Sequence, residues 1–143
     1  MNRRDFISAG LVGLTLVPVA FSGCGAKKSP RGVVKLGGTV VYDGKPVPAG
    51  FMITFTPAGS GGRPSAAIVE DGGKFYAKYS SAEDGVEHGQ LKVTIGWDEE
   101  RNDGAPVPEG FEALSKSYGS LDAALEITVD KANTSFELSF PKK

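Results

Sequence analysis

The sequence is poor in residues that form disulfides, bind metals or build membrane-spanning helices. Its 143 residues include one cysteine, one histidine and one tryptophan. A single cysteine cannot form a disulfide within the chain, so the fold must depend on its hydrophobic core. The apolar run at residues 6–21 contains glycine and proline and falls short of the roughly 20 apolar residues that a membrane-spanning helix needs. The net charge of −1 argues against a nucleic-acid partner, which would need a concentrated basic surface.

The single histidine also leaves little material for catalysis. His88 precedes Gly89 at the expected start of a strand. A base for nucleophilic catalysis would also need a nucleophile and an orienting group, and the spacing of residues does not indicate either one. We expect His88 to be a solvated turn residue. Nothing in the sequence resembles a phosphate loop, a zinc site or a paired-carboxylate hydrolase, so we expect no enzymatic activity and no cofactor.

The amino-terminal segment has the three parts of an export signal. Arg3 and Arg4 supply the charged start, residues 6–21 supply the apolar middle, and small residues precede Cys24. We therefore predict a signal peptide at residues 1–23. Residues 24–32, which contain two lysines, a proline and an arginine, are expected to form an unfolded tether. Residues 33–143 are expected to form one domain, which is a suitable length for a single core.

Two motifs indicate the kind of signal. The sequence RRDFI at residues 3–7 resembles the twin-arginine export motif, so Arg3, Arg4 and Phe6 are the predicted export-signal residues. The sequence FSGC at residues 21–24 resembles a bacterial lipobox, in which the cysteine thiol receives a diacylglycerol before cleavage. Cys24 is therefore the predicted lipidation site, with an inert buried cysteine as the alternative. Two or three acyl chains would hold the mature protein on a membrane, since one chain gives only marginal binding.

The rest of the chain has the period of β-strands. The full chain has 20 glycines and nine prolines, and most of them separate short stretches in which apolar and other residues alternate. Asp43-Gly44 predicts a tight turn, and Asp71-Gly72-Gly73 predicts a hairpin. Seven strands are predicted, near residues 36–42, 51–56, 66–70, 74–79, 91–97, 125–129 and 136–140. This number and spacing of strands predicts an all-β sandwich of the immunoglobulin-like kind.

Residues 98–122 have no clean periodicity, although residues 111–118 could form a short helical turn. A loop of this length is often functional. Four carboxylates at its start are candidate calcium ligands, because calcium takes many oxygen ligands in a flexible geometry. They are Asp98, Glu99, Glu100 and Asp103. Their spacing does not fit the helix–loop–helix calcium pattern, and a solvated acidic surface is the favoured interpretation. We therefore assign no metal site.

The aromatic residues allow two interpretations. Trp97 follows three alternating aliphatic residues on the same face of a predicted strand, which favours packing in the core. Alternatively, several aromatic rings could form a platform for sugars or peptides. The candidates are Tyr76, Tyr79, Trp97, Phe111 and Tyr118.

Several motifs resemble a known family. The sequences GTVVYDGKPV at residues 38–47 and GFMITFTP at residues 50–57 look like the carboxypeptidase regulatory-like and transthyretin-like β-sandwich. GGKF at residues 72–75 and GQLKVTI at residues 89–95 continue the pattern. The chain is most similar to the short lipoproteins of this type in planctomycete-like bacteria, which share the Gly-Cys-Gly signal exit and a late Tyr-Gly. The motifs lie at turn and core positions, so the resemblance implies a seven-stranded transthyretin-like sandwich and no activity.

One class of enzyme with the transthyretin fold has a terminal sequence motif that this chain lacks. Hydroxyisourate hydrolases end in Tyr-Arg-Gly-Ser, which residues 117–120 partly resemble. The arginine is missing here, the motif is not at the terminus, and the several histidines of that family are absent. We therefore expect no hydrolysis of that kind.

The sequence thus predicts a lipid-anchored, non-catalytic β-sandwich lipoprotein of the bacterial cell envelope. It would be membrane-anchored and extracytoplasmic, and would present loops to a protein or envelope-polymer partner. One alternative is a calcium-dependent or carbohydrate-binding module that uses residues 98–122. Another is an accessory subunit that folds in the cytoplasm and is exported with its partner, which would explain a twin-arginine signal.

Overall fold

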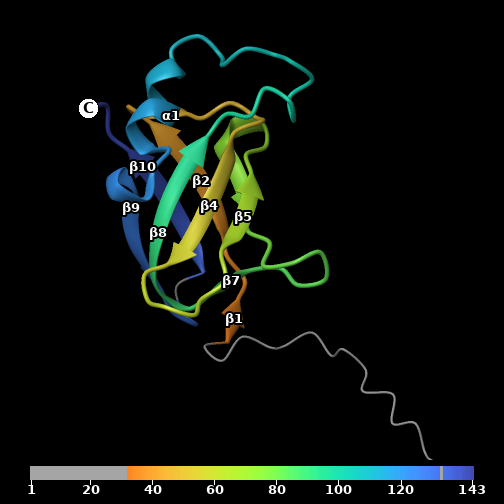
Figure 1. Ribbon diagram of the computed structural model, residues 1–143, viewed down its shortest axis with the longest axis vertical. Coiled ribbons are helices and arrows are strands. Elements are labelled where there is room, and N and C mark those ends of the chain that lie inside the picture. The colour runs from red at the N-terminus through yellow and green to blue at the C-terminus, as the bar shows by residue number, and fades with distance from the viewer. Residues whose placement is uncertain (1–31, 133) are drawn as a thin grey trace, which may run out of the picture.

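The computed structural model describes residues 32–132 and 134–143 (Figure 1). The predicted signal peptide, its residues Arg3, Arg4 and Phe6, and the lipidation site Cys24 lie outside this range. Within the described residues, no helix is long and apolar enough to cross a membrane.

Two four-stranded sheets stack face to face (Figure 1). The first sheet has the order β5-β4-β8-β9 and is antiparallel throughout. Its strands are β4 (Met52–Pro57), β5 (Ser65–Ile68), β8 (Gly89–Gly96) and β9 (Leu125–Val129). In the second sheet, β2 pairs in parallel with β10 on one side and antiparallel with β3 and β6 on the other. Its strands are β2 (Gly37–Tyr42), β3 (Lys45–Pro46), β6 (Lys74–Tyr76) and β10 (Ser135–Phe140).

Smaller elements close the two ends of the sandwich. At one end, β1 (Val33–Val34) pairs with β7 (Val86–Glu87). At the opposite end lies α1 (Glu112–Tyr118), together with the loop that precedes it (Figure 1). Two short 3-10 helices complete the described elements, η1 (Asp71–Gly73) and η2 (Leu121–Ala123). We call the end with β1 the β1 pole and the end with α1 the α1 pole.

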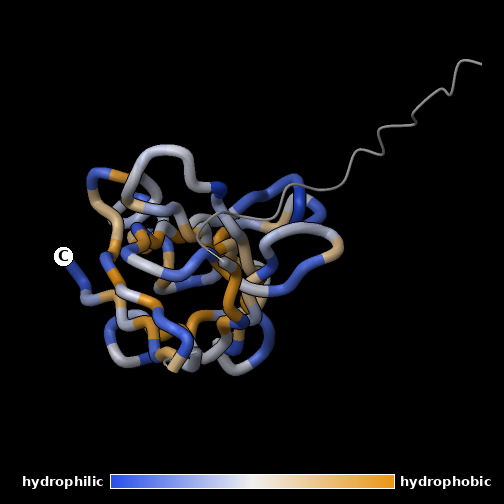
Figure 2. Tube along the Cα trace, turned by 90° about the horizontal axis from the view of Figure 1, so that it is seen from below, coloured by the Kyte–Doolittle hydropathy of each residue, from blue (hydrophilic) through white to orange (hydrophobic). Residues whose placement is uncertain are grey.

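The core lies between the two sheets. It forms because every second side chain of a strand points towards the opposite sheet. In β8, every second residue from Leu91 to Ile95 is buried, while the intervening residues are half-buried. In the second sheet, Leu138 of β10 lies beside Val40 of β2, and both side chains are buried. Burial of one such side chain contributes roughly 1.5–3 kcal/mol to stability. Viewed from below, hydrophilic segments lie mainly in the outer loops (Figure 2).

The structure confirms an all-β protein with one short helix. Each of the seven predicted strands overlaps a strand of the structure, and the predicted helical turn at residues 111–118 is α1. The Asp43-Gly44 turn is also confirmed, because it joins β2 to β3 with φ angles of 50° and 75°. The described residues form ten strands in three sheets. The finer assignment to a seven-stranded transthyretin-like sandwich stays a prediction.

The predicted hairpin around Asp71-Gly72-Gly73 needs a correction. β5 pairs with β4 in the first sheet, whereas β6 pairs with β2 in the second. Backbone hydrogen bonds join the two segments from Glu70 to Lys74, at 2.7 Å, and between Ala66 and Lys78, at 2.7 and 3.1 Å. Between these points the strands separate, so the turn carries the chain from one sheet to the other.

Candidate functional site

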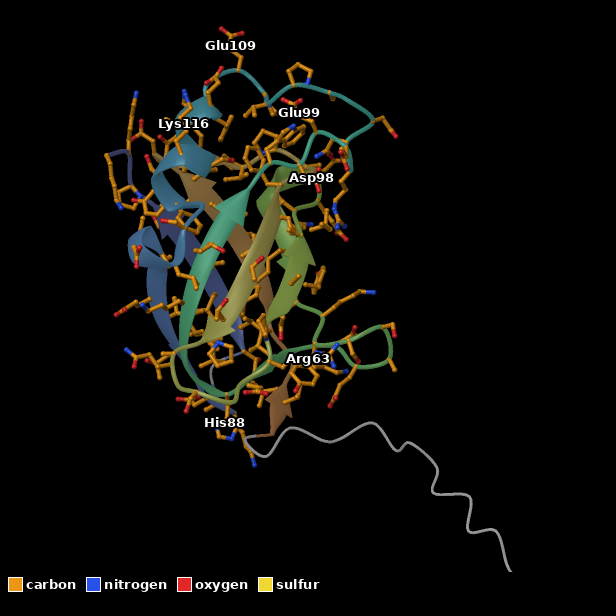
Figure 3. All side chains as sticks on the ribbon, in the orientation of Figure 1. Arg63, His88, Asp98, Glu99, Glu109 and Lys116 are labelled. Atoms are coloured by element: carbon orange, nitrogen blue, oxygen red, sulfur yellow. The ribbon has the colours of Figure 1, made fainter. Side chains whose placement is uncertain are left out.

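Asp98 and Glu99 lie at the α1 pole, where β8 ends (Figure 3), and the other two acidic candidates, Glu100 and Asp103, follow in the same turn. Oδ1 of Asp98 accepts hydrogen bonds from the backbone N–H groups of Glu100, at 3.0 Å, and Arg101, at 3.3 Å. The Asp98 carboxylate therefore shapes its own turn, while Glu99, Glu100 and Asp103 are exposed. Among the described residues, no three His, Cys, Asp or Glu side chains lie together in a group that could hold a metal ion. The four carboxylates thus do not converge on one site.

Asn102, in the same segment, has a structural role that the sequence did not reveal. Its side-chain amide donates hydrogen bonds to the backbone oxygens of Gly50, at 3.1 Å, and Asp98, at 2.7 Å. The first bond crosses to the connection that precedes β4, and the second closes the turn after β8. The beginning of the 98–122 segment is therefore tied to the sandwich.

Trp97 packs at the edge of the core. Its ring lies edge-on to Phe51, with 5.0 Å between the ring centroids, and the residue is half-buried. Nε1–H donates a hydrogen bond of 2.9 Å to the carbonyl oxygen of Ala105, and the backbone N–H donates one of 3.0 Å to Oγ of Ser115. The expected core packing is present, but Trp97 covers the end of the core and also holds the following loop.

The alternative of a five-ring aromatic platform is not met, because four of its rings pack within the domain. Besides Trp97, Phe111 packs against Tyr42 and Phe51, and Tyr79 is buried. Tyr118 is buried, and its hydroxyl donates a hydrogen bond of 2.7 Å to the carbonyl oxygen of Pro141. Burial raises the pKa of Tyr118, and the nearby Tyr42 raises it further. Only Tyr76 among the five is largely exposed, at 64%.

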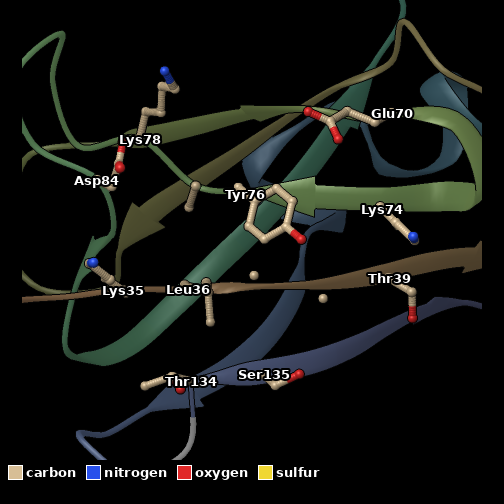
Figure 4. Close-up of a pocket in the computed structure, with 13 residues that line it drawn as sticks. Lys35, Leu36, Thr39, Glu70, Lys74, Tyr76, Lys78, Asp84, Thr134 and Ser135 are labelled. Atoms are coloured by element: carbon tan, nitrogen blue, oxygen red, sulfur yellow. The ribbon is translucent and has the colours of Figure 1, made fainter.

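Tyr76 stands in a groove on the outer face of the second sheet (Figure 4). We call this feature the Tyr76 groove. Its volume is about 740 Å³, and it is formed by β2, β6, the start of β10 and neighbouring loop residues. The polar and aromatic side chains that line it include Lys35, Thr39, Lys74, Tyr76, Lys78 and Ser135.

Two glycines give the Tyr76 groove its floor. Gly37 of β2 lies opposite Tyr76 of β6, and a Cβ atom at this position would lie 2.9 Å from the tyrosine ring. A Cβ atom at Gly38 would collide with the backbone oxygen of Phe136 in β10. Side chains here would thus displace either the Tyr76 ring or the parallel strand. The pair Gly37-Gly38 permits both close approaches.

The charges around the groove are predominantly positive. Lys35, Lys74 and Lys78 line it together with two carboxylates, Glu70 and Asp84, which leaves one net positive charge. None of the three lysines forms an ion pair with a described residue. The sequence pattern alone did not indicate this site. The alternation of Lys74, Tyr76 and Lys78 places these side chains on one face of a strand. The sequence does not show that this strand pairs with β2, which completes the groove.

The β1 pole contains a buried carboxylate. Glu87 is 2% exposed, and its Oε1 accepts hydrogen bonds from the Tyr79 hydroxyl, at 3.1 Å, and the Arg63 backbone N–H, at 3.2 Å. The next residue, His88, is half-buried, and its backbone N–H donates a hydrogen bond of 3.3 Å to the carbonyl oxygen of Gly32. The expectation of a fully solvated His88 is therefore only partly met. These bonds fix the segment through which the chain enters the sandwich.

Comparison with known proteins adds no external evidence of function. No protein-family model, no curated protein and no solved structure matches the chain. The functional argument therefore depends on the residues, packing and surfaces described above.

Proposed function

We propose that the protein is a lipid-anchored, non-catalytic lipoprotein of the bacterial cell envelope. In this proposal its sandwich is of the carboxypeptidase regulatory-like, transthyretin-like type and is held on the extracytoplasmic side of a membrane. The observation that carries the proposal is the position of the first described strand. β1 lies at one pole of the sandwich, and the loop and helix at the α1 pole lie at the other (Figures 1 and 3).

This geometry suits an anchor at Cys24. β1 starts nine residues later, at Val33, and nine fully extended residues span at most roughly 32 Å. A diacylglyceryl group on Cys24 would therefore keep the β1 pole close to the bilayer surface. The α1 pole would then face away from the membrane, and the sides of the sandwich would be accessible to partners.

The bonding at the α1 pole supports a role as a scaffold. Asp98, Asn102 and Trp97 each direct a polar side-chain atom to the protein's own backbone. These residues stabilise the pole and give the displayed domain a defined surface. A domain of this kind would act by presenting a folded surface to a partner. The lipid anchor would fix the location of the domain, and the folded surface would make the contact with the partner.

Membrane fractionation tests this proposal. The protein should partition with membranes and be released by detergent, whereas Cys24→Ser should lose the lipid-dependent attachment. Ser29→Ala, in the same segment, is a matched control and should fractionate like the original protein. Equal fractionation of the original protein and Cys24→Ser would contradict the proposed anchor.

A further inference from the structure

We propose that the Tyr76 groove binds an anionic polysaccharide, a chain of sugars that carries carboxylate or sulfate groups. The inference deepens the proposed function and rests on it for its biological setting, because it names the class of envelope polymer that a displayed domain would contact. The evidence is the combination on one open sheet face of an exposed aromatic ring, hydroxyl groups, and three lysines that form no ion pair with a described residue and outnumber the two lining carboxylates (Figure 4).

Tyr76 provides the apolar part of the site. Its side chain is 64% exposed and lies over Gly37, where a larger residue would crowd the ring. An exposed aromatic ring offers a rigid apolar surface and a polar hydroxyl at low entropic cost. The C–H face of a pyranose ring has the complementary shape and polarity, so stacking on Tyr76 would place one sugar unit at the centre of the groove.

The lysines account for the negative charge of the proposed ligand. Lys74 and Lys78 lie two residues to either side of Tyr76, and the rise of an extended chain places each Cα atom roughly 7 Å from that of Tyr76. Lys35 adds a third ammonium from the segment before β2. Because the charges are spread around the ring, a polymer with repeated acidic groups would contact more of them than a single sugar.

The backbone around Tyr76 favours a sugar chain over an extended peptide. A peptide commonly binds a sheet by adding a strand to an edge with free N–H and C=O groups. Here β2 already pairs with β10 on one side and with β6 on the other, at Ser135–Gly37 and Gly37–Tyr76. Recognition at β2 must therefore use side chains, and the hydroxyls of Thr39 and Ser135 are suited to sugar hydroxyls.

The test measures binding of the full-length protein, solubilised in a mild detergent, by isothermal titration calorimetry. The polymers are polygalacturonate, dextran sulfate, neutral dextran and polyglutamate. The variants are Tyr76→Ala, Tyr76→Phe and a triple change of Lys35, Lys74 and Lys78 to Gln. A triple change of exposed lysines elsewhere, Lys116, Lys131 and Lys142 to Gln, is the charge-matched control. Thermal unfolding of every variant shows whether the fold is retained.

We expect the protein to bind polygalacturonate or dextran sulfate and not neutral dextran. Tyr76→Ala should weaken binding roughly tenfold, which corresponds to about 1.4 kcal/mol, and Tyr76→Phe should bind like the original. The groove triple variant should lose more affinity than the control triple variant. The affinities for polygalacturonate and for dextran sulfate show whether the groove prefers carboxylate or sulfate groups.

Three results would overturn the inference: no binding to either acidic polysaccharide, equal losses in both triple variants, or equally tight and Tyr76-dependent binding of polyglutamate. The last result would identify an acidic-peptide site instead. Binding in detergent does not require the lipid on Cys24, so a failure here is distinguishable from a failure of the proposed anchoring.

Discussion

The side chain of Asn102 donates a hydrogen bond to the backbone oxygen of Gly50, 3.1 Å away and 52 positions earlier in the chain. The same amide group bonds to the backbone oxygen of Asp98, at 2.7 Å. One residue thus joins the turn after β8 to the connection before β4, and it helps to order the α1 pole.

Asn102→Ala should lower the free energy of unfolding by about 1–3 kcal/mol, because it leaves the carbonyl oxygen of Gly50 without this donor and leaves that of Asp98 with the backbone N–H of residue 102. Arg101→Ala changes the neighbouring exposed residue and should have an effect within about 0.5 kcal/mol. Chemical denaturation of both variants measures the difference. Equal stability of the two variants would mean that the Asn102 bonds do not stabilise the domain.

Trp97→Ala should destabilise the domain by about 3 kcal/mol, at the low end of aromatic-to-alanine changes because the indole is only half-buried. Trp97→Phe should cost less, since it preserves part of the contact with Phe51, although it loses the hydrogen bond to Ala105. Thermal and urea unfolding would measure both. An alanine variant as stable as the original protein would show that the indole does not support the core.

The four acidic residues at the start of the 98–122 segment should differ in their contribution to stability. Replacing Glu99, Glu100 and Asp103 by their amides should change stability by less than about 1 kcal/mol, because exposed charges contribute little. Asp98→Ala should cost about 1 kcal/mol, since Asp98 accepts two backbone hydrogen bonds. Denaturation with and without added calcium tests both statements. A calcium-dependent rise in the unfolding temperature that the triple amide variant lacks would establish a cation site here.

Tyr118 should make the domain sensitive to alkaline pH. Burial raises the pKa of this tyrosine above its ordinary value of 10.0, so the folded state holds the phenolic proton more tightly than the unfolded state. The resulting stabilisation is fully present below pH 10.0 and is lost as the pH rises through the pKa of the folded state. The unfolding free energy of the original protein should therefore fall more steeply above pH 10.0 than that of Tyr118→Phe.

A matched control for this pH series is Tyr76→Phe, which also removes one tyrosine hydroxyl but at an exposed ring. Its pH profile should follow that of the original protein. If Tyr118→Phe also followed the original profile, the Tyr118 hydroxyl would not be the source of the alkaline sensitivity.

The strands were predictable where buried and exposed residues alternate over several positions. In β8, the buried series through Leu91, Val93 and Ile95 follows directly from the period of two. β1, β3 and β7 have two residues each, and so short a segment has no readable period. They form because larger strands nearby bring their backbones within hydrogen-bonding distance.

Pairing between distant segments was not predictable from local pattern. The turn at Asp71-Gly72-Gly73 has the composition of a hairpin, yet its flanking strands join different sheets. The Tyr76 groove depends on the same pairing, because Gly37 becomes its floor only when β2 aligns with β6. Local composition indicates turns and strand faces, whereas the site depends on register between strands far apart in the chain.

The central claim of lipid anchoring is tested most directly at Cys24. Mass spectrometry of the protein extracted from membranes of the native host should find a mature chain that begins at Cys24 and carries a diacylglyceryl group on its sulfur. Cys24→Ser should yield no such species. An original protein that retains Met1 and an unmodified Cys24 in the soluble fraction would contradict the account.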